Sequence, residues 1–260
     1  MTDFLDISYR VKNRVATISL NRPQTMNAFS QNMRIELLAA TKQAENDEDV
    51  RVVVISAQGK GFSSGTDLSQ GLAGYSDINE QIQAEYKPFL MAIADSKKLY
   101  ISSVNGACAG IGVALALNCD FMVMADNAFL YMAFAAIGLV PDGGSTYHLI
   151  RSMGYKKALQ LFVEAGRLTA DEAEKYGLAN KVVTADQLSA KTQDWAESLA
   201  NLSPLSQSFG KKLFRSAMDA DLQTVLDEES LTQVDAMNSR DHASAVKAFF
   251  AKEKASFIGK

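Results

Sequence analysis

The pattern of apolar and polar residues in the first half of the chain predicts strands that alternate with helices. Residues 15–20 alternate in the manner of a strand, and residues 51–56 form a run dominated by β-branched side chains. Residues 121–124 form another short apolar run. Uninterrupted runs of this kind are typical of parallel strands that are covered on both faces. With helical patterns between them, they indicate βαβ crossovers and an α/β fold.

Two helical patterns lie between these strands. Ser30 is a suitable N-cap for a helix whose apolar residues recur at helical spacing over 33–44. A second helical pattern covers 78–93, but Pro88 lies inside it. Because proline lacks a backbone N–H and its ring crowds the preceding turn, we expect it to kink or split this helix.

The last third of the chain has a mainly helical pattern. Thr169 and Glu172 match a capping box for a short helix that Gly177 can end. A strand-like run follows over 178–183. From Thr184 onward the pattern is helical, and no further strand is predicted.

The length of 260 residues fits one large domain, or one domain with an appendage. Ser203 followed by Pro204 is the pattern of an N-cap and a first-turn proline, and three amphipathic stretches follow it. We therefore expect an α/β core over 1–200 that holds the site, and a helical region over 201–260.

Composition narrows the possible chemistry. The two histidines, His148 and His242, and the two cysteines, Cys108 and Cys119, are too few and too scattered for the usual metal-ligand spacings or a disulfide framework. We therefore expect no metal, and chemistry that uses carboxylates, hydroxyls and backbone amides. A net charge of −4 argues against nonspecific binding to nucleic acid or to an anionic membrane.

The two ends of the sequence carry no targeting pattern. Residues 1–6 lack the basic and apolar regions of a signal peptide, and residues 258–260 do not match a peroxisomal address. We expect a cytoplasmic protein.

Two segments rich in small residues are candidates for a binding site. Residues 59–68 follow the predicted strand at 51–56, and a loop that leaves the carboxyl end of a parallel strand is where open α/β sheets bind ligands. Residues 104–116 lead from a strand end into a helix of very small residues. The first amides of such a helix are free to bind an anion or a polarised oxygen. Taken singly, each segment can also be an ordinary loop or a site of close packing.

A third segment, residues 138–146, contains a carboxylate. Asp142 lies between Pro141 and two glycines, just before a helical pattern, so its side chain is rigidly placed and can project into a cleft. The alternative is that Asp142 only caps the helix that follows, which is a common role for aspartate.

Together, these segments resemble the crotonase family, also called the enoyl-CoA hydratase/isomerase family. The resemblance covers nearly the whole chain and includes five segments in order: Asn21 to Ala28, Phe62 to Leu68, Val104 to Asp120, Glu172 to Val183, and Ala248 to Phe257. It implies a ββα spiral core with a helical C-terminal region for trimerisation. We accordingly expect a homotrimer or a hexamer made of two trimers.

The resemblance implies an acyl-CoA thioester as the substrate, and no cofactor besides the coenzyme A that the substrate carries. The thioester oxygen would accept hydrogen bonds from the backbone amides of Ser64 and Ile111. Such amides stabilise the enolate that forms when a proton leaves the carbon next to the thioester. The residues expected to line the coenzyme A are Ala28, Ser64, Gly65, Thr66, Asp67, Leu68 and Gly110, with Phe249, Lys252 or Lys254 at its nucleotide end.

The residues at the positions of the family's catalytic carboxylates limit which reactions this chain can catalyse. Its hydratases use two glutamates, and their positions fall on Ala114 and Phe134 in this sequence. Neither side chain can hold or activate water, so hydration of a 2-enoyl-CoA is disfavoured.

The Δ3,Δ2-enoyl-CoA isomerases of the family offer a closer resemblance. Their first loop is similar to Ser63-Ser64-Gly65, and Asp142 occupies the position of their single catalytic carboxylate. One carboxylate suffices for a 1,3-proton shift, which takes a proton from C2 of a 3-enoyl-CoA and returns it to C4. This resemblance implies a role in fatty acid metabolism and β-oxidation. Those isomerases carry glutamate where this chain has Asp142, whose side chain is shorter by one methylene.

Four alternatives fit these residues to different degrees. Ring-modifying isomerases of phenylacetate degradation carry an aspartate in a similar Pro-Asp-Gly segment and are the nearest of them; a hydratase-like enzyme is another. A non-catalytic CoA-binding protein is disfavoured by the presence of Asp142. A 4-chlorobenzoyl-CoA dehalogenase also has an aspartate on this loop but needs a nearby histidine and tryptophan, whereas here Trp195 is distant and no histidine precedes His148.

Overall fold

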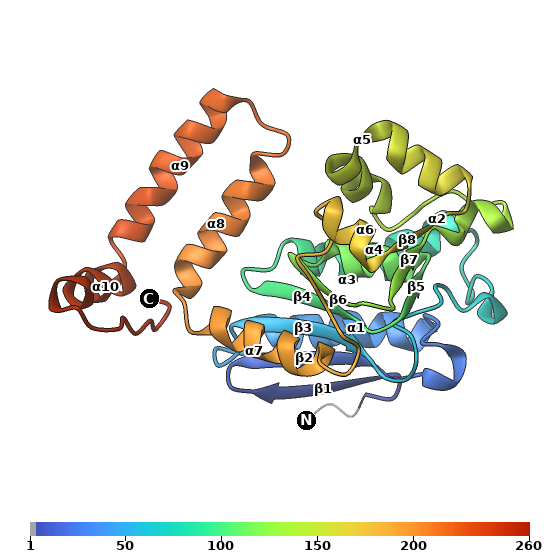
Figure 1. The fold of residues 1–260 in the computed structure, drawn as a ribbon, viewed down its shortest axis with the longest axis horizontal. Coiled ribbons are helices and arrows are strands. Elements are labelled where there is room, and N and C mark those ends of the chain that lie inside the picture. The colour runs from blue at the N-terminus through green and yellow to red at the C-terminus, as the bar shows by residue number, and fades with distance from the viewer. Residues whose placement is uncertain (1–3) are drawn as a thin grey trace.

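A six-stranded sheet forms the centre of the fold in the computed structural model, which describes residues 4–260 (Figure 1). The first pair of strands is antiparallel, and every later pair in this sheet is parallel. The order along the sheet is β1 (Ile7–Lys12), β2 (Val15–Leu20), β3 (Val52–Ala57), β4 (Leu99–Val104), β6 (Phe121–Ala125) and β9 (Lys181–Val183). All six residues of β4 are buried, as expected for a central strand covered on both faces.

A second, three-stranded sheet lies beside the first. Its order is β5 (Ala107–Ala109), β7 (Phe129–Tyr131) and β8 (Arg167–Thr169). β5 follows β4 after two residues and leads directly into α4 (Ile111–Asn118). The start of α4 is thereby fixed between the two sheets.

Helices cover the sheets and complete the chain. In the first two hundred residues these are α1 (Gln31–Asn46), α2 (Ile78–Gln81), α3 (Lys87–Ala94), α4, α5 (Ser145–Val163), α6 (Ala170–Lys175) and α7 (Leu188–Ala200). Three more follow: α8 (Pro204–Ser216), α9 (Leu222–Met237) and α10 (Arg240–Ala251). Figure 1 shows α8 and α9 side by side, with α9 returning toward the start of α8 and α10 following it on the side away from α4. Within residues 4–260, no helix combines the length and the apolar character needed to cross a membrane.

The local signals in the sequence are confirmed at several helix ends. The Ser30 hydroxyl caps α1 by accepting the Met33 N–H at 3.0 Å. Thr169 and Glu172 form the expected capping box of α6. The strand β1 was not predicted, and β9 is shorter than the strand expected over 178–183.

The helical pattern over 78–93 is split, as expected from Pro88, but the split has a specific form. A π-helical turn, Ile82–Tyr86, separates α2 from α3, and Pro88 lies in the first turn of α3. The physical reason is that proline cannot donate a backbone hydrogen bond and its ring displaces the carbonyl four residues earlier, which a wider turn accommodates.

Candidate active site

Two loops meet at the edge of the central sheet and bring the first two candidate segments together. The amides of Phe62 and Ser63 donate to the Ala107 carbonyl at 2.9 and 3.2 Å, and the Ala109 amide donates to the Ser63 carbonyl at 2.8 Å. Gly65 adopts φ +99°, and a Cβ there would lie 3.3 Å from the Ala109 oxygen. Only glycine fits this conformation and this close approach without strain.

One backbone amide that the sequence predicts for an oxyanion hole is available. Ile111 is the first residue of α4, where no earlier helical carbonyl can accept its N–H. Among residues 4–260 this N–H has no hydrogen-bond partner. Its side chain is buried, so only the amide can serve a ligand.

The other predicted amide, that of Ser64, already has a partner within the chain. The Ser64 N–H already donates to the Met26 carbonyl at 2.9 Å, so it is not free to bind a thioester oxygen. The Thr66 N–H, by contrast, has no partner within the described chain. The reason is the extended pairing with Phe29, which takes up the Gly65 carbonyl at 2.8 Å and the Asp67 N–H at 3.2 Å. Alternate amides of an extended segment point in opposite directions, so the Thr66 N–H points away from Phe29.

Asp67, expected to line the coenzyme A, has a structural role in this loop. Its carboxylate accepts the Ser69 hydroxyl at 2.6 Å and the Arg22 Nη1 at 3.0 Å. The hydrogen bond from Ser69 is the main reason that the pKa of Asp67 is lowered, and the Arg22 guanidinium adds to it. The loop is therefore held by its own ionised side chain.

The segment that carries Asp142 is seated directly on α4. Gly143 adopts φ +61°, and a Cβ on it would lie 2.5 Å from Ala114 Cβ and from Ile111 Cδ1. The Asn118 amide group donates to the Gly143 carbonyl at 2.9 Å. Gly143, the residue after Asp142, therefore contacts Ile111, the residue whose amide is free.

Asp142 does not act as a helix cap. α5 begins at Ser145 with Gly144 as its N-cap and with no capping side chain. Asp142 contributes only its backbone carbonyl, which accepts the Ser145 N–H at 3.1 Å and the Ser145 hydroxyl at 2.8 Å. Its side chain is therefore left for another role.

The surroundings of the Asp142 carboxylate raise its pKa and leave it able to accept a proton. Its Oδ1 is buried and has no hydrogen-bond partner among residues 4–260. Burial raises the pKa of Asp142 to about 6, because loss of water disfavours the charged form. Asp142 is therefore mostly ionised at neutral pH, yet it is a stronger base than an exposed aspartate.

The positions where family hydratases carry glutamate hold apolar side chains here. Ala114 is fully buried against Gly143, and Phe134 is 6% exposed. The Phe134 ring lies next to Gly110, 4.0 Å from where a Cβ on that glycine would be. Neither position supplies a group that could activate water.

A cavity of about 520 Å³ opens beside the Asp142 segment. Gly143 and Gly144 border it, and most of its wall is apolar. The other residues that line it are Ile82, Tyr86, Lys87, Leu90, Met91, Ala94, Asp95, Asn118, Tyr147, His148 and Arg215. Burial, together with Arg215 and Arg151, lowers the pKa of His148 to about 4, so that this wall residue is neutral at pH 7.

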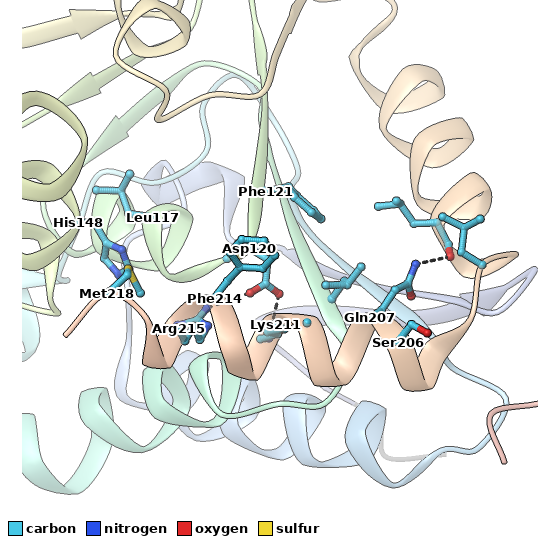
Figure 2. A pocket seen from close by; sticks show the side chains of 15 residues that line it. Leu117, Asp120, Phe121, His148, Ser206, Gln207, Lys211, Phe214, Arg215 and Met218 are labelled. Carbon is cyan, nitrogen blue, oxygen red and sulfur yellow. Dashed lines mark hydrogen bonds and ion pairs between the residues drawn. The ribbon is translucent and has the colours of Figure 1, made fainter. Parts of the chain in front are cut away.

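A larger cavity of about 730 Å³ lies between α8 and the central sheet (Figure 2). Figure 2 shows Lys211 and Arg215 of α8 facing Asp120, and each pair is 2.9 Å apart. Lys211 also donates to two backbone carbonyls. The charged groups are satisfied within the chain, and Asp142 does not line this cavity.

The residues expected at the coenzyme A fall into two separate places. Ala28 and Gly110 are buried beside the loop, and Leu68 is 67% exposed on it. Phe249, Lys252 and Lys254 lie on or just after α10, which Figure 1 places at the opposite end of the molecule from α4. A single copy of the chain therefore does not bring these three residues to the loop, because α9 returns to the start of α8, where the Ser203 hydroxyl lies 3.4 Å from the carboxylate of Asp241 of α10. The expected trimer or hexamer stays a prediction.

The chain matches a known protein family over most of its length. The family model described as enoyl-CoA hydratase/isomerase matches residues 10–260. The chain belongs to the enoyl-CoA hydratase/isomerase family. Members of this family are enzymes that act on acyl-CoA thioesters.

Relatives in this family include two isomerases. A 1,2-epoxyphenylacetyl-CoA isomerase from Escherichia coli K12 is 34% identical over 254 residues, covering 96% of this chain and 97% of that protein. A trans-2-decenoyl-[acyl-carrier-protein] isomerase from Streptococcus mutans is 32% identical, covering 99% of this chain and 100% of that protein. The crystal structure of an enoyl-CoA hydratase/isomerase from Mycobacterium abscessus superposes with a TM-score of 0.92 at 34% identity, covering 98% of this chain and 100% of that chain. The crotonase fold expected from the sequence is confirmed.

Proposed function

We propose that this chain is an acyl-CoA isomerase that moves the double bond of a 3-enoyl-CoA to position 2 by proton transfer through Asp142. The single observation that carries the proposal is the buried Oδ1 of Asp142, which has no partner among residues 4–260 and lies on a segment seated against Ile111. A buried carboxylate oxygen with no hydrogen-bond partner lowers the stability of the folded protein, and it is suited to accept a proton.

The free amides of Thr66 and Ile111 supply the second half of the mechanism. They flank Gly65 and Gly110, and a Cβ on Gly110 would lie 3.7 Å from the Gly65 Cα. A thioester oxygen held there would accept both N–H groups. As Asp142 takes the proton from C2, the electron pair of the C–H bond moves into a dienolate whose negative charge rests on that oxygen. Fixed donors aimed at such a developing charge contribute about 3 kcal/mol each in comparable sites.

Asp142 then returns the same proton to C4 of the dienolate. The C3–C4 double bond becomes a single bond, a C2–C3 double bond forms in conjugation with the thioester, and the carboxylate is regenerated. No water is consumed, which agrees with the apolar side chains of Ala114 and Phe134 at the positions of the hydratase glutamates. The apolar cavity of about 520 Å³ next to Gly143 would take the rest of the acyl group.

The test is isomerisation of 3-hexenoyl-CoA, followed by the absorbance of the conjugated thioester. We expect turnover by the parent protein and a loss of at least about 10³-fold in kcat for Asp142→Asn, since this variant has no base. Asp126→Asn is the matched control, because Asp126 is exposed and does not line the 520 Å³ cavity, and should have the parent's kcat. Equal rates for the parent and Asp142→Asn would overturn the proposal, as would hydration of crotonyl-CoA without isomerisation.

A second candidate is isomerisation of a ring substrate. It is favoured by the 34% identity to 1,2-epoxyphenylacetyl-CoA isomerase. It uses the same amides and carboxylate, so the substrate and not the Asp142 variant separates the two. Turnover of 1,2-epoxyphenylacetyl-CoA with a higher kcat/KM than 3-hexenoyl-CoA would assign the protein to the ring reaction.

A further inference from the structure

A buried cluster of polar side chains lies behind the oxyanion loop and has no place in the mechanism above. Arg34 is 1%, Tyr86 3% and Glu85 6% exposed. Burying a charged pair and a phenol is unfavourable unless their hydrogen bonds are nearly complete. The hydrogen-bond partners of these three side chains therefore indicate the role of the cluster.

The π-helical turn explains why two consecutive residues face inward. Glu85 and Tyr86 are the last residues of Ile82–Tyr86, and both are buried. Nε and Nη2 of Arg34, on α1, lie 2.7 and 2.6 Å from the Glu85 Oε2. The Gln31 amide group donates to the other oxygen of Glu85 at 2.7 Å. The turn is thus fixed to α1 by a paired charge, and this fixes Tyr86 with it.

The third nitrogen of Arg34 connects this pair to the loop. Nη1 donates to the Phe29 carbonyl at 2.8 Å and to the Tyr86 hydroxyl at 3.1 Å. The Phe29 carbonyl is the same group that accepts the Asp67 N–H. Arg34 therefore holds the backbone on one side of Thr66 and the tyrosine on the other.

The direction of the last hydrogen bond follows from the donors available. A guanidinium can only donate, so the Tyr86 oxygen accepts from Arg34. The hydroxyl hydrogen of Tyr86 is then satisfied by the Thr66 Oγ1, 3.1 Å away. Arg34 strengthens this donation by polarising the phenol. The Thr66 hydroxyl is thereby fixed in one orientation next to the amide that faces the ligand.

We propose that Tyr86 is a positioning residue for the oxyanion hole: it holds Thr66 through the hydroxyl so that the Thr66 N–H stays aimed at the thioester oxygen. This inference rests on the proposed function, because it concerns the same pair of amides. Tyr86 also borders the 520 Å³ cavity together with Gly143, so its ring lies on the acyl side of the site. Burial raises the pKa of Tyr86, which keeps the phenol protonated and able to donate at neutral pH.

The test compares Tyr86→Phe with Thr66→Val, which remove the same hydrogen bond from its two ends. We expect each to lower kcat for 3-hexenoyl-CoA by about 10- to 100-fold, less than the loss of an oxyanion donor, with KM changed by no more than about 3-fold. The double variant should lose no more than the stronger single variant, since the two side chains act through one contact. Tyr100→Phe is the matched control, because Tyr100 is also buried but lies on β4, away from the loop, and it should have the parent's kcat.

A spectroscopic measurement separates positioning from mere stability. The thioester carbonyl stretch of bound hexanoyl-CoA, which cannot react, is recorded by isotope-edited infrared difference spectroscopy. We expect the parent and Tyr100→Phe to lower this frequency relative to free hexanoyl-CoA, and both Tyr86→Phe and Thr66→Val to lose most of that shift. If Tyr86→Phe does not fold, Thr66→Val alone decides the question.

A full carbonyl shift in Tyr86→Phe or in Thr66→Val would overturn the inference, and so would losses that multiply in the double variant. These outcomes leave the proposed function intact as long as Asp142→Asn is inactive. Conversely, a parent protein that does not isomerise 3-hexenoyl-CoA overturns the proposed function, while the carbonyl shift of bound hexanoyl-CoA still tests the role of Tyr86.

Discussion

The two halves of the candidate site differ in how their polar atoms are satisfied. In the loop that carries Thr66, the neighbouring backbone and the Thr66 hydroxyl are hydrogen-bonded, which leaves the amide free. In the segment that carries Asp142, the backbone is seated on α4 while Oδ1 of the carboxylate is buried without a partner among residues 4–260. The first half is fixed by its hydrogen bonds, whereas the proposed mechanism requires the second half to exchange a proton.

This difference matches what each half has to do. Amides stabilise a developing negative charge only if they are already aligned when it forms, so their surroundings must be rigid. A proton carrier must change its charge during the reaction, and any fixed donor on Asp142 would lower its pKa and weaken it as a base. The lack of a partner for Oδ1 of Asp142 is therefore as informative as the hydrogen bonds around Thr66.

The largest effect among these tests is expected from a substitution that moves the Asp142 segment but leaves the carboxylate in place. In Gly143→Ala, the new Cβ would overlap Ala114 and Ile111 at 2.5 Å, and φ is +61°. We expect a loss of about 100-fold in kcat, because displacement of a reacting group by about 1 Å has effects of this size.

Gly138→Ala is the matched control for this prediction. It lies in the same segment at φ +73°, but no atom is within 4 Å of the added Cβ. It carries comparable backbone strain without the overlap, so we expect it to retain most of the activity. Equal losses in the two variants would mean that strain, and not the seat on α4, is responsible.

The pH dependence of the reaction should report the buried base. With the pKa of Asp142 raised to about 6 by burial, the fraction of enzyme with an ionised carboxylate falls as the pH drops below that value. We expect kcat/KM to be level above pH 7 and to fall about tenfold for each unit well below pH 6. Tyr86→Phe should lower the whole curve without moving its midpoint. A flat profile between pH 5 and pH 8 would argue against Asp142 as the base.

The smallest expected effect is on stability, and it has the opposite sign from the effect on activity. Because the pKa of Asp142 is raised to about 6 in the folded protein, its ionisation lowers the stability of the fold as the pH rises from about 4 to about 6, and the loss is complete above that range. Asp142→Asn should therefore raise the free energy of unfolding at pH 7.5 by at most about 3 kcal/mol. The gain should shrink toward pH 4, in urea titrations at fixed protein concentration. No gain relative to Asp126→Asn at pH 7.5 would show that the charge is not destabilising.

The sequence was sufficient to predict the parts of the site that depend on local structure. The free amide of Ile111 follows from a helix that begins just after Gly110, and the fixed place of Asp142 follows from the proline and glycines around it. The β3 strand and the α1 helix were likewise predicted from local patterns, to within a residue at each strand end.

The errors fall where a contact links distant segments. Nothing near Ser64 in the sequence shows that its amide is taken by Met26, a residue nearly forty positions earlier, so the free amide of Thr66 was not predicted. Tyr86 was seen only as an apolar position in a helical pattern, because its orientation depends on a π-helical turn and on Arg34. The raised pKa of Asp142 depends on burial, which becomes visible only in three dimensions.

The central claim is that Asp142 carries one proton from C2 to C4, and isotopic labelling tests it most directly. The parent protein and Asp142→Asn are incubated in ordinary water with 3-hexenoyl-CoA that carries deuterium at C2, and the product is examined by NMR at early conversion. Because Oδ1 of Asp142 is buried, we predict deuterium at C4 of the 2-hexenoyl-CoA formed by the parent, and almost no product from the variant. Product without deuterium at C4, or product formed by the variant at the parent's rate, would contradict the account.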